Sequence, residues 1–108
     1  MNHTVLLTED AAADLADIVD YVAAADGPLR ARRVLDRFET TLAHLEGFPE
    51  RGAHPPELLE LGIREYREVF FKPYRVIYRV QSPSVWVLVI ADGRREMQRL
   101  LARRLLGA

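Results

Sequence analysis

The 108-residue sequence contains no cysteine. Disulfides, thiolate metal ligands and thiol nucleophiles are therefore excluded together, and the chain suits a reducing compartment. No apolar run approaches the roughly 18 residues that a membrane-spanning helix needs. The first residues also lack the basic and apolar segments of a secretory signal. We therefore expect a cytoplasmic protein with no membrane partner.

Lysine is nearly absent: Lys72 is the single example, and arginine supplies the other positive charges. These charges are distributed unevenly along the chain. Residues 1–62 hold 12 acidic and 5 basic residues (net −7), whereas residues 63–108 hold 4 acidic and 10 basic residues (net +6). The asymmetry indicates a basic surface for an acidic partner or nucleic acid, or else acidic helices that pair with a basic sheet inside one fold.

The composition indicates one folded domain over residues 1–108. Hydrophobic residues make up 49% of the chain and charged residues 29%, as in folded proteins rather than disordered ones. The length also leaves little room for a second domain. No phosphate-binding glycine loop, zinc pattern or nucleophile elbow is present, so we expect neither a metal nor a cofactor.

Two amphipathic helices are predicted in the first half. Thr8 is a suitable N-cap, and apolar residues then recur at helical spacing over residues 9–25. The segment Asp26-Gly27-Pro28 breaks this helix and begins the next, which ends near Gly47 as its C-terminal cap. So short a turn predicts an antiparallel helical hairpin. An acidic row on the first helix lacks the further ligands of a metal site and predicts a solvated face: Asp10, Asp14 and Asp17.

A change of apolar period to two residues predicts a sheet in the second half. After a loop over residues 50–62, strands are expected over residues 63–71, 74–80 and 85–91, with the first turn at Lys72-Pro73. Residues 3–7 predict a short first strand, and residues 94–106 a basic closing helix. The last strand is apolar throughout, Trp86 included, which is typical of a strand covered on both faces.

The predicted fold class is therefore α+β. Its order is an N-terminal strand, an α-helical hairpin, a three-stranded antiparallel meander and a C-terminal helix. The hairpin should cover one face of the sheet, with Tyr74 and Tyr78 pointing into that core. The other face is left to the closing helix and to whatever binds there.

Three sequence blocks on the expected elements carry a family resemblance. They are Leu-Gly-Ile-Arg-Glu-Tyr-Arg at residues 61–67, Pro-Tyr-Arg-Val-Ile-Tyr-Arg-Val at residues 73–80 and Ile-Ala-Asp-Gly-Arg-Arg-Glu at residues 90–96. In this order they resemble the successive signatures of RelE/ParE toxins, and the two front helices match in length and place. Asp92 departs from the pattern, since many ParE-like members carry histidine there.

The resemblance implies the toxin of a bacterial two-gene module, plasmid-borne or chromosomal. A cognate antitoxin would wrap the toxin with its C-terminal segment, which we expect to be acidic, and would be the partner that contacts operator DNA. RelE-like members cut messenger RNA on the ribosome. ParE-like members poison DNA gyrase and are not known as nucleases.

The residues favour the gyrase branch. In the ribonuclease branch, Arg75 and Arg95 would match catalytic arginines, but the family's lysine positions fall on Tyr66 and Glu68 and its tyrosine position near Leu101. Arginine stabilises a phosphate but is a poor general base, because it stays protonated. We therefore predict no catalytic residue.

Five arginines are the predicted target-binding residues. The alternative for each is an ion pair within the fold or a solvated sheet edge. The closing helix should carry a solvated basic face with Arg99, Arg103 and Arg104. A plain nucleic-acid-binding module and a non-toxic partner-binding domain remain open as other functions. The predicted target-binding set is Arg64, Arg75, Arg79, Arg94 and Arg95.

Overall fold

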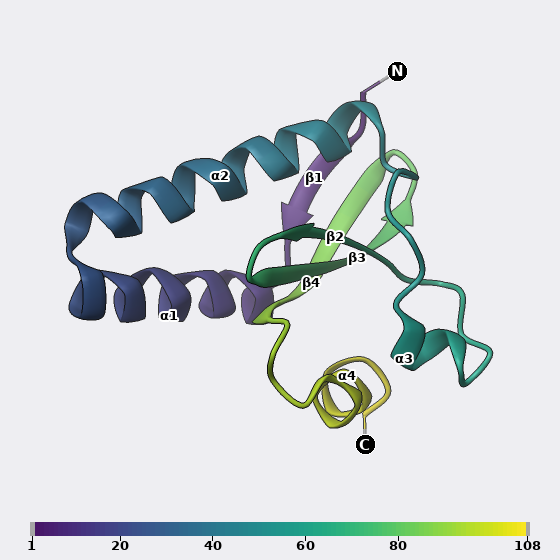
Figure 1. The fold of residues 1–108 in the computed structure, drawn as a ribbon. Helices are drawn as coiled ribbons and strands as arrows, with labels where there is room; N and C mark the ends of the chain where they lie inside the picture. The colour runs from purple at the N-terminus through teal and green to yellow at the C-terminus, as the bar shows by residue number, and fades with distance from the viewer. Residues whose placement is uncertain (1, 108) are drawn as a thin grey trace.

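A computed structural model describes residues 2–107 and has an α+β fold with the predicted order of main elements (Figure 1). The helices α1 and α2 lie side by side, and their connected ends project beyond the sheet. No helix among residues 2–107 is long and apolar enough to cross a membrane. The elements are β1 (Thr4–Leu7), α1 (Glu9–Asp26), α2 (Pro28–Gly47), α3 (Pro56–Leu59), β2 (Arg67–Phe71), β3 (Tyr74–Gln81), β4 (Ser84–Asp92) and α4 (Met97–Leu105).

Local sequence signals set the ends of the hairpin helices. The Thr8 side chain accepts a hydrogen bond from the Ala11 backbone N–H and so caps α1. Gly27 then adopts a φ of 94°, which side-chain-bearing residues rarely adopt, and Pro28 begins α2. The predicted hairpin is confirmed. Gly47 is the last residue of α2 rather than the residue that follows it.

The four strands form one sheet in the order β1-β4-β3-β2. Strands β2, β3 and β4 are the predicted antiparallel meander, and β1 pairs with β4 in parallel. A bulge between Ile77 and Tyr78 shifts the β3–β4 register. Strand β2 is therefore one edge of the sheet, and β1 is the other.

Both faces of the sheet are packed. On the hairpin face, Phe38 of α2 meets Phe71 of β2 edge-on, with ring centroids 5.4 Å apart. Tyr78 is fully buried there, as predicted, and its hydroxyl accepts a hydrogen bond from the Gly52 N–H. The opposite face packs against α3 and α4 through a second core cluster: Leu58, Tyr66, Ile77, Val89, Ala91, Met97, Leu100 and Leu101.

Three local predictions were wrong. The expected strand over residues 63–71 begins only at Arg67, because the preceding segment contains the short helix α3 where a loop was expected. The closing helix begins at Met97, since the Glu96 carboxylate accepts a hydrogen bond from the Arg99 N–H and caps the helix there. Trp86 is only half-buried, so β4 is not covered on both faces along its whole length.

Two predictions of solvated charge were also wrong. Arg104 of α4 donates to both carboxylate oxygens of Asp14 of α1, at 3.0 and 2.9 Å, and to the Leu88 carbonyl. Asp14 also accepts a hydrogen bond from the Ile90 N–H at 3.0 Å. Both side chains are more than four-fifths buried. We call this ion pair the Asp14–Arg104 link, because it joins the first helix to the last.

Candidate functional site

Arg75 lies inside the molecule although its sequence context suggested a binding surface. It is 8% exposed and points from β3 towards α3 and β2. Its Nε donates to Glu68 at 2.7 Å, while its two Nη atoms donate to the two carboxylate oxygens of Glu57 at 2.8 and 2.7 Å. Gly93 leaves room for the arginine stem, because a Cβ there would lie 3.2 Å from Arg75 side-chain carbons. We call Glu57, Glu68 and Arg75 the Arg75 cluster.

The two carboxylates of the Arg75 cluster respond to it in opposite directions. The hydrogen bond from Arg75 lowers the pKa of Glu57 and outweighs partial burial. Burial raises the pKa of Glu68 by more than its hydrogen bond from Arg75 lowers it. The pKa of Arg75 is raised, chiefly by its hydrogen bonds to Glu57. The guanidinium therefore stays charged, is held by two acids, and is already neutralised before any external phosphate arrives.

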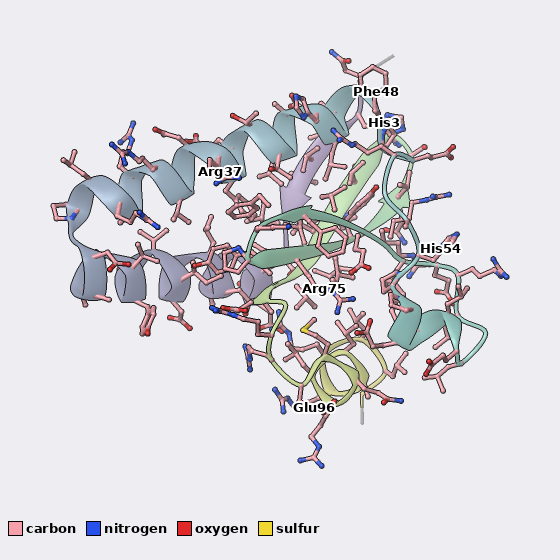
Figure 2. The ribbon with its side chains drawn as sticks, in the orientation of Figure 1. His3, Arg37, Phe48, His54, Arg75 and Glu96 are labelled. Carbon is pink, nitrogen blue, oxygen red and sulfur yellow. The ribbon has the colours of Figure 1, made fainter. Side chains whose placement is uncertain are left out.

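The family's ribonuclease positions carry no exposed acid–base groups in this chain. Tyr66 and Leu101 belong to the core, and Glu68 belongs to the Arg75 cluster. The His54 ring hydrogen-bonds to the Tyr66 carbonyl and not to Arg75 (both residues are labelled in Figure 2). No hydrogen bond within residues 2–107 joins a histidine to Arg75 or Arg95.

The other four predicted arginines are accessible but do not gather into one pocket. Arg79 is 41% exposed and lies 3.7 Å from a Glu65 carboxylate oxygen. Arg94 pairs with Asp92 at the start of the segment that leads to α4. Arg64 and Arg95 are exposed, and neither has an ion-pair partner within the described chain.

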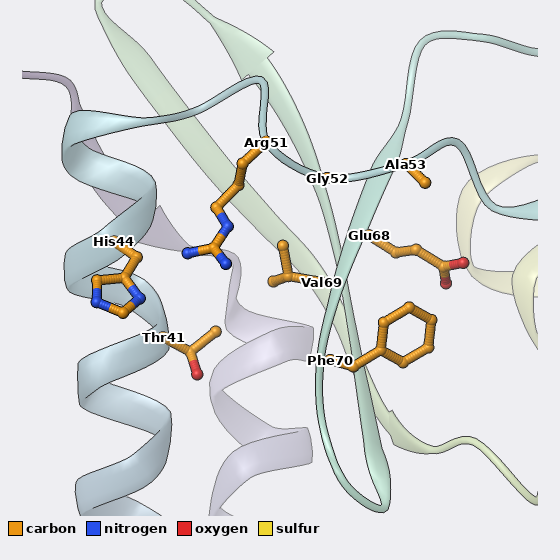
Figure 3. A pocket seen from close by; sticks show the side chains of 8 residues that line it. All are labelled: Thr41, His44, Arg51, Gly52, Ala53, Glu68, Val69 and Phe70. Atoms are coloured by element: carbon orange, nitrogen blue, oxygen red, sulfur yellow. The ribbon is translucent and has the colours of Figure 1, made fainter.

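A basic groove along the edge strand β2 was not predicted. Its lining includes His44 of α2, Arg51 of the following loop and Val69 of β2, and its volume is about 420 Å³. In Figure 3 the Arg51 side chain extends between α2 and β2, whereas Glu68 and Phe70 point to the other side of the strand. A neighbouring hollow continues the groove past Arg37 and Lys72. We call the two hollows together the edge groove.

The backbone of β2 is partly unpaired along the edge groove. The Glu68 N–H points outward and donates to the Ala53 carbonyl at 2.8 Å. Phe70 lies two residues further along, so its backbone groups also point outward. Over residues 2–107 no backbone group outside the sheet pairs with Phe70. An extended segment could add to β2 at this point.

A larger cavity lies where the hairpin meets the turn between β2 and β3. It measures about 820 Å³ and mixes apolar, acidic and basic side chains. Its lining includes Tyr21 of α1, Arg33 of α2 and Tyr74 of β3. Among the described residues, no group of three or more histidine or acidic side chains could hold a metal ion.

Glu57 and Glu68 are the site residues that sequence reasoning missed. Glu68 left a signal: in an antiparallel pair turning at Lys72-Pro73, Phe70 lies opposite Arg75 and Glu68 lies on the same face. Glu57 left none, since its position depends on how the chain folds between α2 and β2. The edge groove depends on the same segment.

Comparisons with known proteins agree on one family. The model of the family described as the ParE toxin of the type II toxin–antitoxin system parDE matches residues 5–97. Toxin ParE3 of Caulobacter vibrioides is 29% identical over 100 residues, which is 93% of this chain and 96% of that protein. A solved structure, titled as a chromosomal ParDE TA system from P. aeruginosa, has a TM-score of 0.69 at 23% identity. It covers 83% of this chain and 95% of its own, and is similar in fold.

Proposed function

Because the chain belongs to the ParE toxin family of type II toxin–antitoxin systems, we propose that it poisons DNA gyrase by binding and catalyses no reaction. The observation that carries this proposal is the state of Arg75. The strand arginine that a ribonuclease would use on a phosphate is buried between two carboxylates. Among the exposed arginines, Arg79 and Arg94 have carboxylates beside them only as ion-pair partners, and the pKa of Asp92 is lowered by its hydrogen bond from Arg94, which makes it a weaker base.

The proposed target-binding residues are Arg64, Arg79, Arg94 and Arg95. Each is accessible or half-accessible, so each can contact a partner without unfolding. The pair of Arg79 with Glu65 is exposed on both sides and costs little to exchange for a partner's carboxylate. Arg94 is exposed as well, although its partner Asp92 is half-buried. Arg75 is no longer among the proposed target-binding residues, because a partner that drew it away would leave two carboxylates without their counter-charge.

Neutralisation by a cognate antitoxin forms the second part of the proposal. An extended, acidic antitoxin segment would add to β2 at Phe70 and meet the positive charges of the edge groove, which come from Arg37, Arg51 and Lys72. An amphipathic antitoxin helix would fill the larger cavity beside the hairpin. The antitoxin would also bind operator DNA. The toxin would act in the cytoplasm, where its release from the antitoxin would arrest growth and so favour cells that keep the plasmid.

Expression in a bacterial host tests the proposal. Induction of the toxin alone should arrest growth and produce filaments with a DNA-damage response, and co-expression of the neighbouring antitoxin gene should abolish all three effects. Undisturbed growth despite abundant soluble protein would contradict toxicity and favour a domain that only binds a partner.

One observation favours the ribonuclease as a second candidate: carboxylates do lie beside Arg75, and the pKa of Glu68 is raised in the direction of a general base. In that case Arg75 and Arg95 would be the catalytic residues. The wild-type protein would then cleave ribosome-bound message without affecting gyrase, and Glu68→Gln would lose this cleavage. Under our proposal, Glu68→Gln leaves message intact, as the wild type does.

A further inference from the structure

The outward face of α4 and of the turn before it carries a row of three arginines. Arg95, Arg99 and Arg103 are all exposed and line one hollow of about 460 Å³. They recur every four residues. Within the helix this spacing corresponds to a rise of about 6 Å, so Arg99 and Arg103 lie one turn apart on the same face. Arg95 lies in the turn before the helix, and all three arginines line the same hollow. We call them the α4 arginine row.

These arginines differ from most others in the second half of the fold. Arg75, Arg79, Arg94 and Arg104 each have a carboxylate within ion-pair distance. Within residues 2–107, the guanidinium groups of the α4 arginine row form no ion pair and no hydrogen bond. The one acid in the hollow, Glu96, uses its carboxylate to cap the Arg99 N–H (Figure 2 labels Glu96 at the start of α4). The hollow therefore keeps a net positive charge, with three arginines against one glutamate, and none of the three guanidinium groups is held in an ion pair among the described residues.

The neighbourhood of the row indicates what kind of partner fits it. A protein interface depends on apolar or aromatic anchors at its centre. The apolar residues Met97, Leu100 and Leu101 of α4 are buried against the sheet, and the exposed positions over residues 94–103 are all polar or charged. The first exposed apolar side chain is Leu106, beyond the end of the helix. Binding to a phosphate backbone needs no such anchor, because charge and regular spacing suffice.

From this arrangement we infer that the α4 arginine row binds the phosphate backbone of a DNA duplex. The inference goes beyond the proposed function, since it concerns the DNA itself and can be measured without gyrase. If the chain does bind gyrase, the row would give it a second contact on the DNA that gyrase holds. The contacts would be independent of sequence, because arginine–phosphate pairs carry no base information.

The test is fluorescence anisotropy of a labelled 30-base-pair duplex of arbitrary sequence with the purified chain between 50 and 200 mM NaCl. Three phosphate contacts predict a log–log salt slope near −3, at about −0.9 per contact. The variant Arg95→Gln/Arg99→Gln/Arg103→Gln should bind the duplex at least about tenfold more weakly at 50 mM NaCl. Its salt slope should also fall almost to zero, because each arginine removed lowers the magnitude of the slope by about one.

A matched control removes the same charge elsewhere. Arg30→Gln/Arg32→Gln/Arg33→Gln neutralises three exposed arginines of α2 and should bind DNA as the wild type does. Circular dichroism establishes that both variants are folded. Three results would overturn the inference: wild-type binding by the row variant, equal losses in both variants, or no DNA binding together with row-dependent binding of a poly-glutamate peptide, which would assign the row to an acidic protein.

Discussion

Arg75 illustrates how burial changes the meaning of a residue. Its alternation with apolar neighbours predicts that it shares one face of β3 with Arg79, and it does. Arg79 reaches the surface, whereas Arg75 meets Glu57 and Glu68 under α3. The two arginines therefore have different roles: Arg79 is available to a partner, and Arg75 holds the loop segment onto the sheet.

Replacing Arg75 tests this structural role. Arg75→Ala leaves two largely buried carboxylates without a counter-charge, and should lower the free energy of unfolding by about 3–5 kcal/mol. Arg75→Lys should recover part of the loss, because one ammonium group cannot bond both carboxylates in the same fork geometry. Urea denaturation measures both changes. A fully stable Arg75→Ala protein that no longer inhibits its target would return Arg75 to the binding surface.

The pH dependence of stability separates Glu57 from Glu68. The pKa of Glu57 is lowered in the folded state, so its contribution is present above the ordinary glutamate pKa of about 4.3 and is lost as pH falls through the lowered value. Glu57→Gln should therefore cost stability at pH 7 and progressively less towards pH 3.

Glu68 has the opposite sign. Its pKa is raised, so its ionised form opposes folding, and this cost disappears as pH falls through the raised pKa. Glu68→Gln should cost less than Glu57→Gln at pH 7. Urea titrations of both variants between pH 3 and 7 provide the measurement. Equal losses at neutral pH would show that the two carboxylates are equivalent partners of Arg75.

At the scale of elements, the sequence was most informative where one periodic pattern governs a whole segment. The stripes of α1 and α2, the Gly27–Pro28 break and the alternation in β3 each predict an element from local residues, and the structure has all of them. The segment between α2 and β2 was mispredicted because long-range packing of Leu58 against α4 and the Arg75–Glu57 pair decide its path. For the same reason, the edge groove could not be predicted.

The unpaired edge of β2 should be where the antitoxin strand adds. Phe70→Pro removes an outward-pointing N–H that no other described backbone group uses, so the sheet should keep its internal bonds. We expect this variant to stay toxic but to escape its antitoxin, as judged by growth under co-expression. Phe70→Ala is the control, since it removes the ring and keeps the N–H. Full neutralisation of Phe70→Pro would place the antitoxin strand elsewhere.

The Asp14–Arg104 link makes α4 dependent on α1. Asp14→Asn should accelerate hydrogen exchange of the α4 amides, with those of β3 unchanged, because the charged half of a largely buried pair is lost. Asp17→Asn, on the exposed face of the same helix, should leave exchange unaltered. If α4 exchanges at the wild-type rate in Asp14→Asn, the buried apolar residues of α4 alone hold it in place.

For the whole molecule, the charge asymmetry of the sequence has a spatial meaning. Helix α1 carries six acidic residues and no basic one, and the first half meets the second through a few ion pairs, chiefly Asp14–Arg104 and Glu57–Arg75. Most other charges of the basic half stay at the surface. Some acids therefore pair inside the fold, as one of the two alternatives drawn from the charge pattern has it. The remaining arginines leave basic surfaces exposed, and their binding of partners stays a prediction.

We propose that this ParE-family protein acts on its host by binding rather than by cutting. A supercoiling assay with purified gyrase, relaxed plasmid and the purified chain tests it most directly. We expect inhibition by the wild-type protein, and weaker inhibition by Arg64→Gln/Arg79→Gln/Arg94→Gln/Arg95→Gln, with both proteins folded. If gyrase supercoils normally in the presence of the wild-type chain, while the same preparation cleaves ribosome-bound message, the chain acts as a ribonuclease and not by binding gyrase.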